Sequence, residues 1–144
     1  MATDRRAEVT WQGSLMEGAG TITSVTSGAF APLDVSWPSR AEEPAGKTSP
    51  EELIAAAHAS CYSMALSAAL ARAGTPPESL QVSATVTFVP GTGITRSALT
   101  VVGRVPGADA AAFEQAAQGA KDGCPVSKAL TGNVELSVEA RLDG

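Results

Sequence analysis

The side chains of this sequence best suited to covalent or redox chemistry are two cysteines, Cys61 and Cys124. Cys61 lies in the middle of an apolar stretch, and Cys124 stands directly before a proline in the segment CPVSKAL. If the fold brings the two thiols together, one thiolate can attack an oxidant and the other can resolve the sulfenic acid into a disulfide. If the fold keeps them apart, both are small apolar residues of the interior, which is the commoner use of two cysteines.

The two thiols differ in what their local surroundings do to their acidity. A cysteine in the middle of a helix gains nothing from the helix N-terminus, so we expect the pKa of Cys61 to stay at or above its ordinary range. Cys124 occupies the cap position of a short predicted helix with Pro125 in the first turn, where unpaired backbone N–H groups favour a thiolate. A reactive Cys61 therefore requires a positive group from elsewhere in the fold.

Two further titratable residues share the apolar stretch with Cys61. His58 is the only histidine and lies three residues earlier, on the same helix face. A Cys–His nucleophile pair and a metal site are both conceivable, but zinc needs three or four protein ligands, and we expect His58 to pack and to be dispensable for chemistry. Glu51 lies ten residues before Cys61, about 15 Å along a helix axis, so it cannot contact Cys61 of its own helix.

The element that positions these residues is a long helix over Thr48–Gly74. Ser49 is a suitable N-cap, Pro50 suits the first helical position, and Glu52 completes a capping box. Between these signals and Gly74 the sequence is mostly Ala, Leu, Ile, Met and Ser, which predicts a helix buried on all sides. Its small side chains leave room for a second helix, and an antiparallel crossing of two copies would bring Glu51 of one chain toward the centre of the other.

The rest of the chain predicts one α+β domain, 1–144, with antiparallel sheet. Alternating apolar and polar residues predict strands, and Asp109 is a helix cap. We expect hairpin strands at 8–14 and 20–27, a third strand at 29–37, a polar loop at 39–49, a second hairpin at 80–89 and 94–105, helices at 110–121 and 126–130, and a last strand at 134–142.

The composition excludes several classes of partner. A net charge of −5 without a basic stripe disfavours nucleic acid and anionic membranes. The first residues contain no apolar leader segment, and we expect no window to approach a membrane span, so the predicted location is the cytoplasm.

Several segments, in order along nearly the whole chain, resemble the osmotically inducible protein C (OsmC) family, relatives of the organic hydroperoxide resistance (Ohr) proteins. They are TSPEELIAAAHASCYSMALS, ITRSALTV, VPG, AAFEQAAQGAK and CPVSKAL. The resemblance implies an intertwined homodimer, with antiparallel-rich sheets around long central buried helices, that acts as a thiol-dependent peroxidase without metal, haem or flavin. It also implies that Cys61 is the peroxidatic thiol, that Cys124 is the resolving thiol, and that Glu51 fills the family's acidic position.

An arginine assigns the branch of the family. Arg40, in WPSRAEEPAGKTSP, matches the loop arginine of OsmC proteins, whereas Ohr proteins carry theirs in an N-terminal glycine-rich segment. Arg40 would supply the cation that Cys61 lacks, and Glu51 would orient it. The expected substrate is an organic hydroperoxide, and the expected reductant is an external dithiol such as a lipoyl protein or a thioredoxin-like protein. Two alternatives remain: a non-enzymatic redox-sensing or binding protein of the same fold, and a hydrolase that uses Cys61 and His58.

Overall fold

The computed structural model describes residues 1–144, which form two compact units, Met1–Leu53 and Ile54–Gly144. Helix α2 begins at the end of the first unit and continues into the second. The assignment of the whole chain to a single domain stays a prediction.

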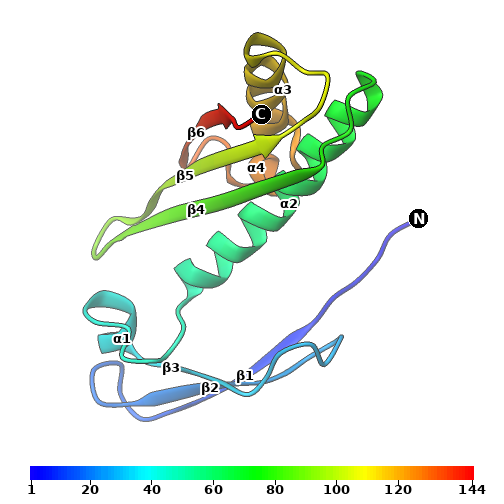
Figure 1. The fold of residues 1–144 in the computed structure, drawn as a ribbon. Helices are drawn as coiled ribbons and strands as arrows, with labels where there is room; N and C mark the ends of the chain where they lie inside the picture. The colour runs from blue at the N-terminus through cyan, green and yellow to red at the C-terminus, as the bar shows by residue number, and fades with distance from the viewer. The chain divides into compact units, whose positions relative to one another are not determined.

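The first unit is a small antiparallel sheet with one short helix, drawn in blue to cyan in Figure 1. Gly20 sits in the central strand between Trp11 and Val35, and a Cβ there would lie 2.7 Å from the Trp11 ring. A glycine is therefore needed where the indole crosses the sheet. The hairpin and the third strand are confirmed, with these bounds: β1 Ala7–Gln12, β2 Ala19–Val25, β3 Leu33–Val35 and the helix α1 Trp37–Ala41.

Helix α1 corrects the predicted polar loop at 39–49. Ser36 and Ser39 form a capping box, in which the Ser36 hydroxyl accepts from the Ser39 N–H at 3.2 Å and the Ser36 N–H donates to the Ser39 hydroxyl at 3.0 Å. Pro38 in the first turn suits a helix start. A helix of one turn has no apolar periodicity, so only its caps could have indicated it.

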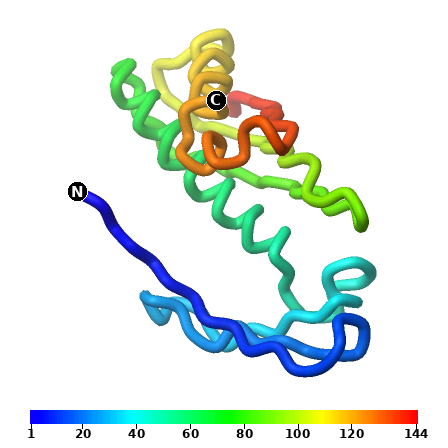
Figure 2. The backbone as a smooth tube through the Cα atoms, turned by 180° about the vertical axis from the view of Figure 1, so that it is seen from behind, coloured from blue at the N-terminus to red at the C-terminus, as the bar shows by residue number.

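The second unit holds a three-stranded sheet covered by helices (Figure 1). Strands β4 and β5 form the predicted antiparallel hairpin, whereas β6 pairs parallel to β5. Figure 2 shows this last strand, in red, returning beside β5 after the two helices that precede it. A parallel neighbour requires such a crossover. The bounds are α2 Pro50–Arg72, β4 Ser79–Val89, β5 Gly93–Arg104, α3 Ala110–Gly123, α4 Pro125–Leu130 and β6 Glu135–Leu142.

The core of the second unit lies between β5 and the helices α2 and α3. Alternate β5 side chains are buried on one face of the strand. The Tyr62 hydroxyl donates to the Ala117 carbonyl at 3.0 Å and so ties α2 to α3. A Cβ at Gly103 would lie 2.5 Å from Phe113, so this glycine lets the phenyl ring pack on the strand. The buried apolar cluster comprises Tyr62, Leu66, Leu70, Leu99, Val101, Val105, Phe113, Ala117, Ala120 and Cys124.

Helix α2 confirms the long predicted helix, but within one chain it is not buried on all sides. In the second unit, burial follows a single stripe with a spacing of four residues, His58, Tyr62, Leu66 and Leu70, while Met64 is 72% exposed. One sheet and one neighbouring helix cover only one face of a helix. The expectation that no segment approaches a membrane span is also wrong. Helix α2 is long and apolar enough to cross a membrane, with a mean hydropathy of 1.4 in its most apolar window. The core helix of a globular protein passes the same test of length and hydropathy, and α2 packs one buried stripe into the core of the second unit.

Candidate active site

The two thiols meet in the second unit. Cys61 comes from the middle of α2 and is half-buried, and Cys124 comes from the junction of α3 and α4 and is fully buried. Their side chains are hydrogen-bonded to each other, and both are free thiols. The two cysteines lie 63 positions apart in the sequence, and they come into contact because α3 packs back against α2. The arrangement needed for a reversible disulfide is therefore present in the reduced chain.

Cys124 occupies the predicted cap position between two helices. Its backbone N–H donates to the Ala120 carbonyl at the end of α3 (3.0 Å), and its carbonyl accepts from the Lys128 N–H in α4 (3.0 Å). Pro125 follows in the first turn of α4. These bonds fix the backbone at residue 124, so the sulfur is held at one place against α2.

The surroundings push the acidities of the two thiols in opposite directions. Burial raises the pKa of Cys61, and so does its hydrogen bond with Cys124. Burial also acts to raise the pKa of Cys124, but hydrogen bonds from Cys61, Ser127 and Val126 outweigh it and lower that pKa. The hydrogen bond between the two thiols therefore favours the thiol form of Cys61 and acts to lower the pKa of Cys124. This agrees with the expectation that a reactive Cys61 requires an added cation.

His58 is fully buried between two serine hydroxyls that the sequence analysis did not single out. Its Nδ1 lies 2.6 Å from the Ser97 Oγ of β5, and its Nε2 lies 2.8 Å from the Ser127 Oγ of α4. Burial lowers the pKa of His58, so the ring is neutral. Because both ring nitrogens are engaged by serines, neither is left to activate Cys61 or to bind a metal. Two features of the sequence could have indicated these serines. Ser97 falls on the buried side of the alternating pattern in its strand, and Ser127 lies three residues after Cys124.

Arg40 and Glu51 form an ion pair in the first unit. The Arg40 Nε donates to both carboxylate oxygens of Glu51 (3.1 and 3.2 Å), and Nη2 donates to Oε2 at 2.9 Å. Arg40 comes from the last turn of α1 and Glu51 from the first turn of α2. The Glu51 side chain is only 8% exposed and that of Arg40 is 30% exposed. The carboxylate therefore holds the guanidinium in a fixed orientation, as expected for a carboxylate that orients a cation.

The structure thus pairs the four candidate residues two by two, Cys61 with Cys124 and Arg40 with Glu51. The two pairs belong to different compact units. The action of Arg40 on Cys61 stays a prediction, and so do the catalytic roles of all four residues.

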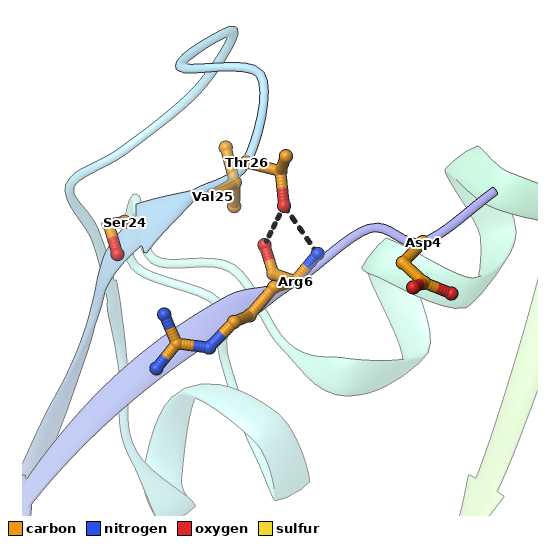
Figure 3. A pocket seen from close by; sticks show the side chains of 5 residues that line it. All are labelled: Asp4, Arg6, Ser24, Val25 and Thr26. Atoms are coloured by element: carbon orange, nitrogen blue, oxygen red, sulfur yellow. Dashed lines mark hydrogen bonds between the residues drawn. The ribbon is translucent and has the colours of Figure 1, made fainter.

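The first unit also contains a hollow of about 440 Å³ beside its N-terminal strand, shown in Figure 3. It is lined by Asp4, Arg6, Ser24, Val25 and Thr26. The Thr26 hydroxyl accepts from the Arg6 N–H and donates to the Arg6 carbonyl, which closes the end of the β1–β2 pair. No candidate site residue lines this hollow, and we assign it no part in the chemistry.

Comparison with known proteins identifies the family. The family model for OsmC-like proteins matches residues 43–139. The chain is 39% identical over 144 residues to peroxiredoxin OsmC of Escherichia coli K12, in an alignment covering 98% of this chain and 99% of that protein. The chain belongs to the OsmC family. The resemblance noted in the sequence is therefore confirmed.

Solved structures show the OsmC fold as well. The organic hydroperoxide resistance protein OhrB of Bacillus subtilis matches with a TM-score of 0.70 and 26% identity, covering 94% of this chain and 98% of that one. An OsmC-like protein of unknown function from Vibrio cholerae matches with a TM-score of 0.72 and 20% identity, covering 96% and 99%. The predicted α+β OsmC-like fold with a long central helix is confirmed, and the structure divides its strands into two small sheets. The intertwined dimer stays a prediction.

Proposed function

We propose that this OsmC-family protein reduces organic hydroperoxides, and hydrogen peroxide as well, through Cys61 and Cys124. The observation that carries the proposal is the contact of two free thiols, one half-buried and one buried. The family includes thiol peroxidases: the 39% identical relative is named a peroxiredoxin. The chain is accordingly a thiol-dependent peroxidase. The name of the Bacillus subtilis structural relative supports an organic hydroperoxide as the substrate.

The reaction balances with the groups of the site and one external dithiol. The Cys61 thiolate attacks the outer peroxide oxygen, an S–O bond forms, the O–O bond breaks, and the leaving alkoxide takes a proton to become an alcohol. Cys124 then attacks the sulfur of the Cys61 sulfenic acid, so that an S–S bond forms and the S–O bond breaks. The departing hydroxide takes the Cys124 proton and leaves as water. A lipoyl protein or a thioredoxin-like dithiol reduces the disulfide by thiol exchange.

Arg40 and Glu51 supply the missing charge in this proposal. The pKa of Cys61 is raised by its own surroundings, so the attacking thiolate requires a cation. Arg40 is a permanent cation held by Glu51, and it would also stabilise the charge that develops on the leaving oxygen.

A homodimer completes the site. Outside its buried stripe α2 leaves an apolar surface half-exposed, and a second copy crossing by two-fold symmetry would cover it. Since Glu51 cannot reach Cys61 along its own helix, each proposed site draws on both chains. In this proposal each active site lies at the subunit boundary.

A steady-state assay tests the function. The wild-type protein should consume an organic hydroperoxide with dihydrolipoamide as the dithiol, and Cys61→Ser should lose turnover. A redox sensor would react once and not turn over with any dithiol. A Cys–His hydrolase would hydrolyse an activated ester and leave the hydroperoxide unconsumed. Either of these results from the wild-type protein would reject the peroxidase assignment.

A further inference from the structure

A buried chain of polar groups runs from β5 to the resolving thiol. The Ser97 hydroxyl contacts His58 Nδ1, His58 Nε2 contacts the Ser127 hydroxyl, and the Ser127 hydroxyl contacts the Cys124 sulfur. His58, Ser97, Ser127 and Cys124 are each 0% exposed. No buried side-chain nitrogen or oxygen in the structure lacks a partner. Apolar side chains would fill this space without the cost of desolvating three polar groups, so packing alone does not explain the chain.

Counting protons fixes the direction of these hydrogen bonds. The Ser127 hydroxyl has one hydrogen, so when it donates to the Cys124 thiolate it can only accept from His58. Nε2 must then carry the proton, and the bare Nδ1 accepts from the Ser97 hydroxyl. Once Cys124 is a thiolate, the neutral ring allows this arrangement alone, and burial keeps the ring neutral by lowering the pKa of His58. The Cys124 thiolate thus selects the tautomer, Ser97 accommodates it by donating to Nδ1, and the protonated Nε2 keeps the Ser127 hydrogen directed toward sulfur.

We propose that His58, acting through Ser127, is a positioning residue for the resolving step, because it holds the Ser127 hydroxyl as a donor to the Cys124 sulfur. This inference rests on the proposed function, in which Cys124 attacks the Cys61 sulfenic acid. In that step the S–S bond forms and the S–O bond breaks, and the hydroxide released takes up the proton that Cys124 lost on becoming a thiolate and leaves as water. His58 and Ser127 keep the same protons before and after the step. They stabilise the nucleophile and take no part in the first attack on peroxide.

The test separates the two steps kinetically. Rapid mixing with one equivalent of an organic hydroperoxide gives the rate of peroxide loss, and the decay of the trappable sulfenic acid gives the rate of disulfide formation. Ser127→Ala removes the donor and should slow disulfide formation by about tenfold, the typical worth of one hydrogen bond to a charged group. Peroxide loss should keep its wild-type rate within about twofold. Equal slowing of both steps would overturn the proposal.

Two amide substitutions at residue 58 distinguish positioning from packing. His58→Gln places an amide nitrogen near the former Nε2 and can donate to Ser127, whereas His58→Asn is shorter and reaches only the Ser97 side. We expect rapid disulfide formation in His58→Gln and slow formation in His58→Asn. Similar slowing in both variants would mean that the ring only fills space. Thr131→Val is the matched control, because it removes a 2.8 Å hydrogen bond to the Ser127 carbonyl in the same helix without touching the chain. Slowing in this control as large as in Ser127→Ala would also overturn the proposal.

A titration keeps the proposal testable if no variant, wild type included, consumes peroxide. In a Cys61→Ser background only Cys124 titrates by thiolate absorbance, and adding Ser127→Ala should raise its pKa. The titratable groups that face Cys124 are Cys61 and Tyr62 of α2 and, through Ser127, His58. Burial raises the pKa of Tyr62 well above its usual range, so the phenol stays neutral during the titration. An unchanged Cys124 pKa would reject the role of Ser127, whereas a raised pKa without peroxide turnover would reject only the peroxidase function.

Discussion

In the first unit the candidate residues are an ion pair, with Arg40 partly exposed and Glu51 buried, whereas in the second they are thiols, hydroxyls and a neutral imidazole, nearly all buried. The Arg40 side chain is 30% exposed in its ion pair, while Cys124, His58 and Ser127 are inaccessible. A buried charge is costly unless it is paired, and a neutral hydrogen-bonded network avoids that cost. The second unit provides such hydrogen bonds to Cys124, and they lower the pKa of this thiol.

This difference divides the chemistry of the two thiols. Cys124 obtains its stabilisation from its own unit, through Ser127 and the first turn of α4. The pKa of Cys61 is raised by its own unit, and in the proposed mechanism this thiol takes its stabilising charge from Arg40. Variants of Arg40 and Glu51 should therefore affect the first attack, and variants of the His58 chain should affect the second.

The largest expected effect comes from mixing two impaired proteins. Homodimers of Cys61→Ser should lack turnover and those of Glu51→Ala should retain only the slow turnover of a site without a positioned cation, but a heterodimer contains one site with both groups intact if each site draws on both chains. Activity should reappear after unfolding and refolding a 1:1 mixture, at up to about a quarter of the wild-type rate, because about half of the dimers are heterodimers and each has one intact site of two. Purifying the heterodimer with two different tags makes the result quantitative. A verified heterodimer without activity would refute the shared site.

Removing the cation alone should have the next largest effect. Arg40→Met should raise the pKa of Cys61 and slow the attack on peroxide by about ten- to a hundredfold, the usual worth of a charge-assisted hydrogen bond. Arg40→Lys keeps the charge but loses the two-point contact with Glu51, so its rate of attack should lie between those of the wild type and Arg40→Met. Thiolate absorbance and the second-order rate of peroxide loss are the measurements. An unchanged titration in Arg40→Met would mean that another group serves Cys61.

The smallest expected effect is on stability at acidic pH, and it arises from His58 in the second unit. Burial holds the pKa of folded His58 below its unfolded value of about 6.5, so the unfolded state binds the proton more readily. Stability is complete above pH 6.5 or so and falls as the pH decreases toward the folded pKa. Urea unfolding at pH 7.5 and 5.5, at one protein concentration, should show a smaller loss in His58→Gln than in the wild type. Equal losses would place the acid sensitivity elsewhere.

The sequence predicted the features that depend on neighbouring residues and missed those that depend on residues far apart in the chain. The helix over 48–74 was found at 50–72 and Asp109 does cap α3, because caps and periodicity act within a few residues. The parallel pairing of β6 was missed because it depends on a crossover through two helices. Helix α1 was missed because its signal is limited to two serines and a proline.

The candidate site shows the same limit. The family resemblance singled out Cys61 and Cys124, and the cap position of Cys124 correctly indicated the thiol with the lowered pKa. The contacts of His58 lie 39 and 69 residues away in the sequence, at Ser97 and Ser127. No local pattern encodes such contacts, and a serine in a strand or a short helix is ordinary on the surface. Only the folded chain shows that these two serines are buried on either side of one ring.

The division of labour between the thiols is tested most directly by a single turnover of Cys124→Ser. The pKa of Cys124 is the lowered one, so it is the natural competitor for the first attack. If Cys61 attacks first, Cys124→Ser should consume one equivalent of organic hydroperoxide and leave a sulfenic acid that dimedone traps on Cys61, identified by peptide mass. Cys61→Ser should consume none under the same conditions. No consumption by a folded Cys124→Ser protein, together with one equivalent consumed by Cys61→Ser, would reverse the two roles and contradict the account.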